Sequence, residues 1–255
     1  MSAFFLPRGD GEWEATPHTS GPWSQEHQHG GPPAALLARA MRLVATDPEM
    51  MFARLTFDLL GPVPVGPLSI EARVARPGRS VELVEASLSA GGREAMRAAA
   101  WRVSVTDAPE VGAGKAPPAR PADETPLPEG WNESGYLRAL EWRFARGGYD
   151  GRGPATVWTR MRFPLIPDEE PDPLTRLLVL ADSGNGASAE LPLDQWLFIN
   201  PELTVHVHRL PEGEWICMDA NTTISSGGAG LALSTLSDEH GPVARGAQSL
   251  LVRGR

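Results

Sequence analysis

Apolar and polar positions in the first half of the chain predict one helix followed by four strands. Residues 34–45 are apolar or alanine on nearly every side of a helix, and prolines stand near its start, so a buried helix is expected there. Segments that alternate or run apolar follow, separated by turns rich in glycine and proline, which is typical of antiparallel strands. We expect these strands at residues 52–59, 67–75, 80–90 and 94–105.

The second half repeats this pattern. Residues 136–145 and 155–163 predict strands, residues 171–186 predict a short apolar helix that ends in glycines, and four further segments predict strands. Leu55-Thr56 corresponds to Leu203-Thr204, and the two halves share a Pro-x-Gly turn. The matching order and spacing indicate an internal repeat.

A segment rich in proline, alanine and glycine separates the two halves. Residues 106–130 have no sustained apolar period, which is typical of a partly extended linker. The predicted domains are therefore 1–105 and 131–255. One helix with long antiparallel strands packs best when the sheet wraps around the helix, and two such units can join their edge strands. We expect an α+β fold in which two wrapped sheets form one continuous sheet.

Composition excludes several classes of partner. The chain has 255 residues, a formal net charge of −9 and a single lysine, Lys115, which disfavours a nucleic-acid partner. No apolar run of 18 residues exists, so no membrane partner is expected, and the N-terminal residues lack a basic signal region, which predicts a cytoplasmic protein. Cys217 lies in an apolar stretch and is expected to be a buried, inert thiol.

Asp182 is the strongest candidate for chemistry. It follows the apolar run Leu-Leu-Val-Leu-Ala near the end of the second predicted helix, where a carboxylate opposes the helix dipole. Such a position offers no structural advantage. A sheet wrapped around the helix would also desolvate the carboxylate and raise its pKa toward the range useful for a general base.

Two residues with amide side chains, Gln248 and Asn200, are further candidates for the same site. Gln248 interrupts an otherwise apolar or small stretch, and its counterpart in the first half is Ala99. Gln248 either satisfies a buried backbone group or binds a water or carbonyl beside Asp182. Asn200 precedes Pro201 and is compatible with a simple turn residue.

Histidines and glycines give weaker signals. His206 and His208 share one face of a strand, but no third ligand is marked near them, so no metal site is expected. His29, Gly30 and Gly31 precede the first helix, where glycines either form a tight turn or expose backbone N–H groups to an anion. No cofactor motif is present, since the glycine-rich run at residues 224–232 lacks a lysine and a following helix.

Taken together, these motifs resemble the acyl-CoA thioesterase family with tandem hotdog folds, typified by thioesterase II. The resemblance is carried by residues 29–41 and 55–88 in the first half, and by residues 180–186, 198–209 and 244–253 in the second. It implies a double hotdog fold, an acyl-CoA or related acyl-thioester substrate, and a role in fatty acid metabolism. Such pseudo-dimers also assemble further in the family, so a homo-oligomer is compatible with the resemblance.

The resemblance also implies roles for individual residues. The family's water-binding positions fall on Asp182, Asn200 and Gln248, with Asn200 standing where thioesterase II has a hydroxyl residue. The cleft-lining positions include His29, Gly30 and Gly31. Two alternatives stay open: a hotdog hydratase or dehydratase, which normally shows an Asp and a His on one motif, and a non-catalytic protein that binds acyl thioesters.

Overall fold

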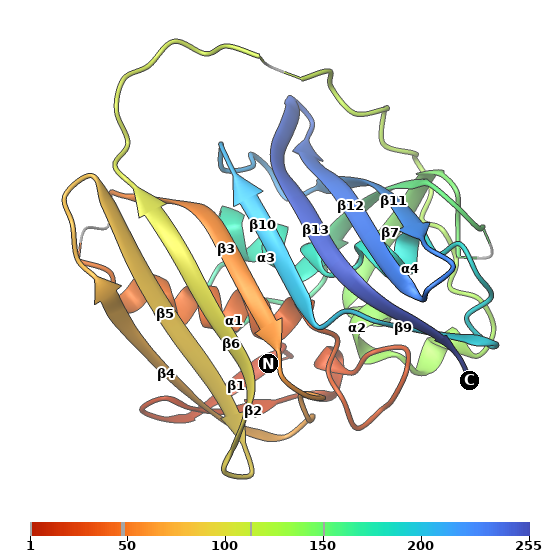
Figure 1. Cartoon of the computed structure of the whole chain (residues 1–255), viewed down its shortest axis with the longest axis horizontal. Helices are drawn as coiled ribbons and strands as arrows, with labels where there is room; N and C mark the ends of the chain where they lie inside the picture. Colours follow the sequence, from red (N-terminus) through yellow and green to blue (C-terminus); the bar gives the residue numbers. More distant parts are fainter. Residues whose placement is uncertain (1, 47–48, 113, 150) are drawn as a thin grey trace.

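One continuous antiparallel sheet runs through the whole chain (Figure 1). The structure is a computed structural model that describes residues 2–46, 49–112, 114–149 and 151–255. Within these residues the sheet has 13 strands. The first-half strands run, in spatial order, β1 (Phe5–Gly9), β2 (Glu12–Ala15), β4 (Pro67–Arg76), β5 (Val81–Ala90), β6 (Arg93–Val103) and β3 (Met51–Leu59). The second-half strands continue with β10 (Glu202–Val207), β13 (Gly241–Gly254), β12 (Ala229–Asp238), β11 (Ile216–Ile224), β8 (Ala155–Met161) and β7 (Leu140–Arg146), while β9 (Trp196–Ile199) pairs with β13.

The two main helices lie on the same face of this sheet (Figure 1). Helix α1 (Gly31–Val44) packs on β4 and β5, helix α3 (Pro173–Ala181) packs on β11 and β12, and the two helices contact each other. Strand residues alternate accordingly: Val84, Ala86 and Leu88 of β5 are buried toward α1 and the residues between them are more exposed. The predicted α+β double hotdog, with two wrapped sheets joined into one, is confirmed.

The junction of the two halves is the pair β3–β10. Thr204 lies opposite Thr56 in the antiparallel register, and their hydroxyl oxygens are 3.3 Å apart. The two residues that matched in the sequence repeat therefore meet at the approximate two-fold axis between the halves.

The same register corrects one detail of the repeat. Ala99 pairs with Thr56, whereas Ala247 pairs with Thr204, so the first-half counterpart of Gln248 is Ala100 rather than Ala99. Ala100 and Gln248 are both buried. A slip of one residue places a strand side chain on the opposite face of the sheet, and the weak sequence repeat could not resolve this difference.

Short elements depart from the predicted pattern. The predicted strand at residues 136–145 is in fact helix α2 (Gly135–Ala139) followed by β7, because the Ser134 hydroxyl caps the helix by accepting from Leu137 N–H. The helix expected at residues 171–186 is divided in two, and its second part is helix α4 (Gly184–Ala187). The sequence pattern does not predict strands β1 and β2 or the 3₁₀ turns η1 (Pro17–Thr19) and η2 (Trp131–Glu133). Each has five residues or fewer, too short for a clear period.

The described residues between β6 and η2 form neither helix nor strand, and part of this segment docks on the second half. Thr125 N–H donates to the Trp142 carbonyl at 2.7 Å, and Phe144 N–H donates to the Thr125 hydroxyl at 3.0 Å. These bonds cover part of β7, the last strand of the sheet, whose backbone groups would otherwise be open to another chain. The boundaries at 105 and 130 remain our proposal for the domains.

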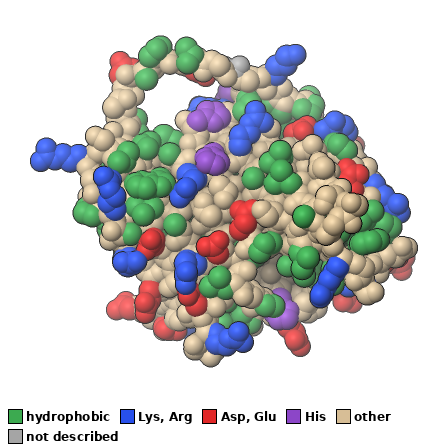
Figure 2. Space-filling view, in the orientation of Figure 1, with side chains coloured by type: hydrophobic (Ala, Val, Ile, Leu, Met, Phe, Trp, Pro, Cys, Tyr) green, Lys and Arg blue, Asp and Glu red, His purple; other side chains and the backbone are tan. Residues whose placement is uncertain are grey.

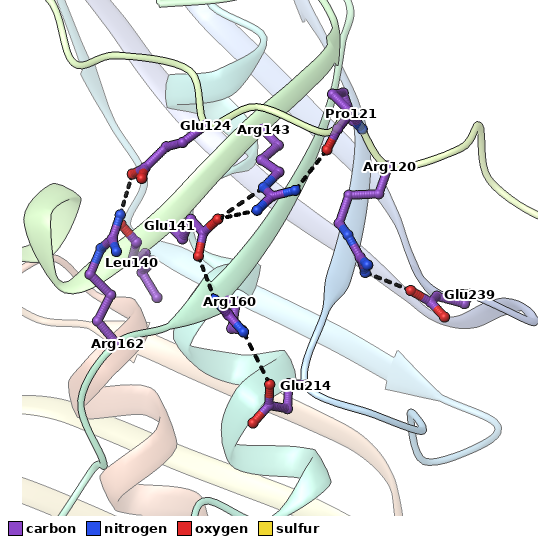
Figure 3. A network of polar contacts seen from close by, with 10 residues as sticks. All are labelled: Arg120, Pro121, Glu124, Leu140, Glu141, Arg143, Arg160, Arg162, Glu214 and Glu239. Atoms are coloured by element: carbon purple, nitrogen blue, oxygen red, sulfur yellow. Dashed lines mark hydrogen bonds and ion pairs between the residues drawn. The ribbon is translucent and has the colours of Figure 1, made fainter.

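An ionic network fixes the same segment (Figure 3). Arg143 donates to the Pro121 carbonyl at 2.9 Å and to the Glu141 carboxylate at 2.6 Å, and Glu141 also binds Arg160 at 2.8 Å. Glu141 is buried, so its two arginine partners are needed to hold it in the charged state. Acidic and basic groups balance here, which makes the network a structural clamp rather than an anion site.

The solvent-facing side of the sheet carries acidic and basic side chains interspersed with separate hydrophobic groups (Figure 2). Among the described residues, no helix has the length and hydropathy needed to span a bilayer.

Candidate active site

Asp182 lies where three helix ends meet. It is the C-cap of α3, it precedes α4, and its Oδ2 accepts the backbone N–H of Gly30, the N-cap of α1, at 3.0 Å. The C-terminus of α3 disfavours a negative charge, whereas the N-terminus of α1 favours it. The N-terminus of α1, in the first half of the chain, therefore stabilises the negative charge on Asp182, which the C-terminus of α3 destabilises.

Two amides hold the other carboxylate oxygen. Asn200 Nδ2 donates to Asp182 Oδ1 at 2.8 Å, and Gln248 Nε2 donates to the same oxygen at 3.0 Å. Gln248 also donates to the Asp182 carbonyl at 3.0 Å and accepts the backbone N–H of Asn185 at 3.0 Å. Asn200 comes from the connection between β9 and β10, and Gln248 from the inner face of β13. The structure therefore brings the three residues of the expected water site into direct contact.

The environment of Asp182 raises its pKa to about 6. Burial is the main cause, since the residue is only 5 % exposed, while the hydrogen bonds from Asn200, Gly30 and Gln248 act in the opposite direction. A carboxylate with this pKa is ionised at neutral pH and is basic enough to accept a proton from water.

His29 stands beside the carboxylate as a neutral imidazole. Its ring stacks on Tyr136 with centroids 3.7 Å apart and an interplanar angle of 3°. Its Nδ1 accepts the Gly31 N–H at 3.2 Å and is 3.6 Å from Asp182 Oδ2, too far for a hydrogen bond to the carboxylate. Burial lowers the pKa of His29 to about 3, so the ring is uncharged at neutral pH.

Gly30 and Gly31 let the two helices approach closely. A Cβ on Gly30 would lie 2.6 Å from Asp182 Oδ2, and one on Gly31 would lie 2.1 Å from the Val179 carbonyl oxygen of α3. Their own N–H groups are used within the protein, by Asp182 and by His29. Close packing of α1 on α3, rather than a free anion site, is what these glycines provide.

Sequence reasoning missed Tyr136, whose ring and hydroxyl both contact this site. Tyr136 donates to the Val179 carbonyl at 2.9 Å and lies 2.7 Å from the Ser183 hydroxyl, so it ties α2 to the end of α3 while its ring positions His29. The pattern of residues 136–145 instead predicts a strand at this position. Only contacts between segments distant in the sequence reveal its position.

An aromatic pocket opens beside this cluster. His29 and Ser183 line it next to Asp182, and its apolar wall includes Trp23, Trp131, Tyr136, Trp142, Phe144 and Tyr149. Among the described residues, none that lines it is acidic or basic apart from the neutral His29. This pocket could hold an uncharged, apolar group next to Asp182.

His206 and His208 are exposed and lie away from this cluster on and just beyond β10. No group of three or more metal-ligating side chains occurs within the described part of the chain. Cys217 is buried, and burial raises the pKa of its thiol to about 12, so it stays protonated.

Comparisons with known proteins agree on one family. Residues 19–103 match the model of the acyl-CoA thioesterase N-terminal domain, and residues 115–252 match that of the C-terminal domain. A search of curated proteins gives no match.

Solved structures share the fold over the full chain. A protein assigned as a thioesterase from Novosphingobium aromaticivorans is 21 % identical, with a TM-score of 0.77 and 100 % of both chains covered. A protein assigned as thioesterase II from Thermobifida fusca is 20 % identical, with a TM-score of 0.74, covering 98 % of this chain and 95 % of its own. The acyl-CoA thioesterase II TesB2 from Mycobacterium marinum is 16 % identical, with a TM-score of 0.69 and the same coverage. The two family models together span most of the sequence, and the chain belongs to the acyl-CoA thioesterase family.

Proposed function

We propose that the protein hydrolyses an acyl-CoA, or a related acyl thioester, to the free acid and the thiol, with Asp182 as the general base. The observation that carries this proposal is a buried carboxylate with a pKa near 6, held by donors from three separate segments. We include in the proposal that the enzyme is cytoplasmic and works without a cofactor in fatty acid metabolism.

The hydrogen bonds of Asp182 leave one position for water. Each carboxylate oxygen can accept about two hydrogen bonds. Oδ1 accepts from Asn200 and Gln248, whereas Oδ2 accepts only from Gly30 among the described residues. A water that donates to the remaining position on Oδ2 would be oriented for attack. Asn200 and Gln248 then act chiefly by fixing the carboxylate, because their amide hydrogens are already donated within the protein.

His29 is suited to bind the thioester carbonyl. Because Nδ1 accepts the Gly31 N–H, the single proton of the neutral ring is on Nε2. Nε2 has no partner among the described residues, and the side chain, 13 % exposed, lines the aromatic pocket. An Nε2–H that donates to the carbonyl oxygen would stabilise the negative charge that develops there during attack.

The reaction follows from these positions. Asp182 accepts a proton as the water oxygen bonds to the carbonyl carbon, giving a tetrahedral intermediate whose oxyanion faces His29. The carbon–sulfur bond then breaks, and the coenzyme leaves as a thiolate that takes up the proton that Asp182 accepted from water. Water is consumed and one acid and one thiol are formed.

One observation favours a second candidate, hydration of an enoyl thioester. The structure brings a histidine next to the aspartate, His29 Nδ1 lying 3.6 Å from Asp182 Oδ2, although the two come from different halves. A hydratase would consume the enoyl double bond without releasing free thiol. Thiol release therefore separates the two reactions.

The test is release of free CoA by the purified protein from acyl-CoA substrates. Asp182→Asn keeps the shape of the side chain but removes the base, and we expect kcat to fall about 10²–10⁴-fold. Asp58→Asn, on the exposed face of β3, is the matched control and should retain activity. Unchanged thiol release by Asp182→Asn would refute the mechanism. Binding of acyl-CoA without thiol release by the wild type would instead identify a binding protein.

A further inference from the structure

The aromatic pocket begins at the proposed reaction centre. Ser183, which lines the pocket, follows Asp182 directly in the chain, and His29, which also lines it, lies 3.6 Å from the Asp182 carboxylate. Other hollows on the surface, such as that between Glu71, Arg73 and Glu85, are lined by charged side chains. An acyl group whose carbonyl contacts His29 would therefore extend into the aromatic pocket.

Aromatic rings in contact with one another form much of the wall of this pocket. Tyr149 packs edge-on against Phe144 and Trp142, with centroid distances of 5.0 and 6.3 Å, and its ring is tilted against Trp131 at 6.0 Å. The Trp142 indole is further fixed because its N–H donates to the Leu137 carbonyl at 2.9 Å. Edge-to-face packing of this kind holds rings in preferred geometries, so these walls yield less readily than flexible aliphatic side chains.

The space enclosed is small. The cavity volume is about 50 Å³. For comparison, an apolar cavity of about 150 Å³ binds one benzene ring, and a cavity needs about 10–15 Å³ to hold one water. By this measure the pocket admits roughly three to five non-hydrogen atoms.

We propose, building on the proposed thioesterase function, that the aromatic pocket is the acyl subsite and that it selects short acyl groups, of about two to four carbons. Longer chains and aromatic acyl groups exceed the volume that the rings leave free. The subsite would discriminate by size, since each methylene that does not fit costs about 10-fold or more in kcat/KM.

Gly186 offers a way to fill the pocket without disturbing the backbone. It lines the pocket from α4, and a Cβ at this position would have no atom within 4 Å. Gly186 is exposed and lines the pocket, so we expect the leucine side chain of Gly186→Leu to reach over the acyl subsite and narrow it, and leucine is also the better helix former. Gly61, between β3 and β4, likewise has no atom within 4 Å of a Cβ, which makes Gly61→Leu the matched control. Leu193→Ala enlarges the pocket at a partly buried wall.

The experiment is a chain-length profile of kcat/KM, measured by thiol release from acetyl-, butyryl-, hexanoyl-, octanoyl-, palmitoyl- and benzoyl-CoA. For the wild type and Gly61→Leu we expect a maximum at two to four carbons and at least a 100-fold lower value for octanoyl-CoA. Gly186→Leu should lose butyryl-CoA activity at least 10-fold more than acetyl-CoA activity, and Leu193→Ala should move the maximum to longer chains. A wild-type maximum at octanoyl-CoA or beyond, or a profile that Gly186→Leu leaves unchanged, would overturn the proposal.

A binding measurement keeps this inference separate from the proposed function. S-butyl-CoA and S-octyl-CoA are thioethers that cannot be hydrolysed, and tryptophans of the pocket report their binding by fluorescence. Tighter binding of the butyl compound, lost in Gly186→Leu, supports the subsite even if no acyl-CoA is hydrolysed. Equal or tighter binding of the octyl compound argues against the subsite even if hydrolysis is observed.

Discussion

Asp182 should weaken the fold at neutral pH, and Asp182→Asn should reveal by how much. The pKa of its carboxyl rises from an ordinary 3.8 to about 6 on burial, a difference of about two units. Because one unit corresponds to about 1.4 kcal/mol, the ionised carboxylate costs about 3 kcal/mol of stability above pH 6. The folded state binds this proton more tightly than the unfolded state, so the cost falls as the pH drops from 6 toward 3.8 and is absent below 3.8.

The measurement is the free energy of unfolding in urea for the wild type and Asp182→Asn at several values between pH 4 and 7.5. We expect the variant to gain about 2–2.5 kcal/mol relative to the wild type as the pH rises across this range. The comparison across pH removes the constant cost of placing an amide next to the Gly30 N–H. Asp58→Asn controls for the loss of one negative charge. A difference between Asp182→Asn and the wild type that does not change with pH would refute the raised pKa, and with it the argument for a general base.

Three further outcomes follow from the contacts around the site. Below about pH 6, kcat/KM for thiol release should fall tenfold per pH unit, because the pKa near 6 belongs to Asp182. His29→Phe should keep this pH dependence while kcat drops about 10²–10³-fold, because the neutral His29 only donates a hydrogen bond. Gly31→Ala should lower stability by about 1–3 kcal/mol in urea unfolding and lower kcat, because its Cβ would lie 2.1 Å from the Val179 carbonyl oxygen and would push α1 away from α3. Tyr149→Phe should leave stability unchanged or raise it by about 1 kcal/mol, because the buried Tyr149 hydroxyl has no hydrogen-bond partner among the described residues.

Each of these outcomes has a contrary result. If His29→Phe lost the decrease of kcat/KM at acidic pH, the result would identify the histidine as the base. A Gly31→Ala protein with wild-type stability and kcat would show that the contact between α1 and α3 can relax without cost. Clear destabilisation by Tyr149→Phe would mean that its hydroxyl makes a stabilising bond.

The periodicity of apolar residues is sufficient to predict the long helices and strands. The predicted first-half strands match β3, β4, β5 and β6 to within a few residues, and the expected helix at residues 34–45 corresponds to α1 at Gly31–Val44. Long elements with one buried face repeat the apolar signal often enough to be recognised. The four-residue β2 and the five-residue α2 do not, and Tyr136 was consequently assigned to the wrong element.

Asp182 shows what sequence and structure each contribute to the site. Its unfavourable place at a helix C-terminus was visible in the sequence, and so was the asymmetry that sets Gln248 against an alanine in the first half. The sequence could not show that Gly30, 152 positions away in the chain, donates to the carboxylate, or that His29 is stacked, neutral and protonated on Nε2. Those properties arise from burial and from contacts between the two halves, which depend on how α1 packs against α3.

The sequence by itself therefore determined the duplicated α+β fold, the thioesterase resemblance and the carboxylate to examine, because these follow from local patterns and short motifs. The tertiary structure decided the pKa of Asp182, the tautomer of His29, the true partner of Gln248 in the repeat and the size of the aromatic pocket. Each of these depends on distances between segments far apart in the chain, and hydrophobic periodicity contains no information about such distances.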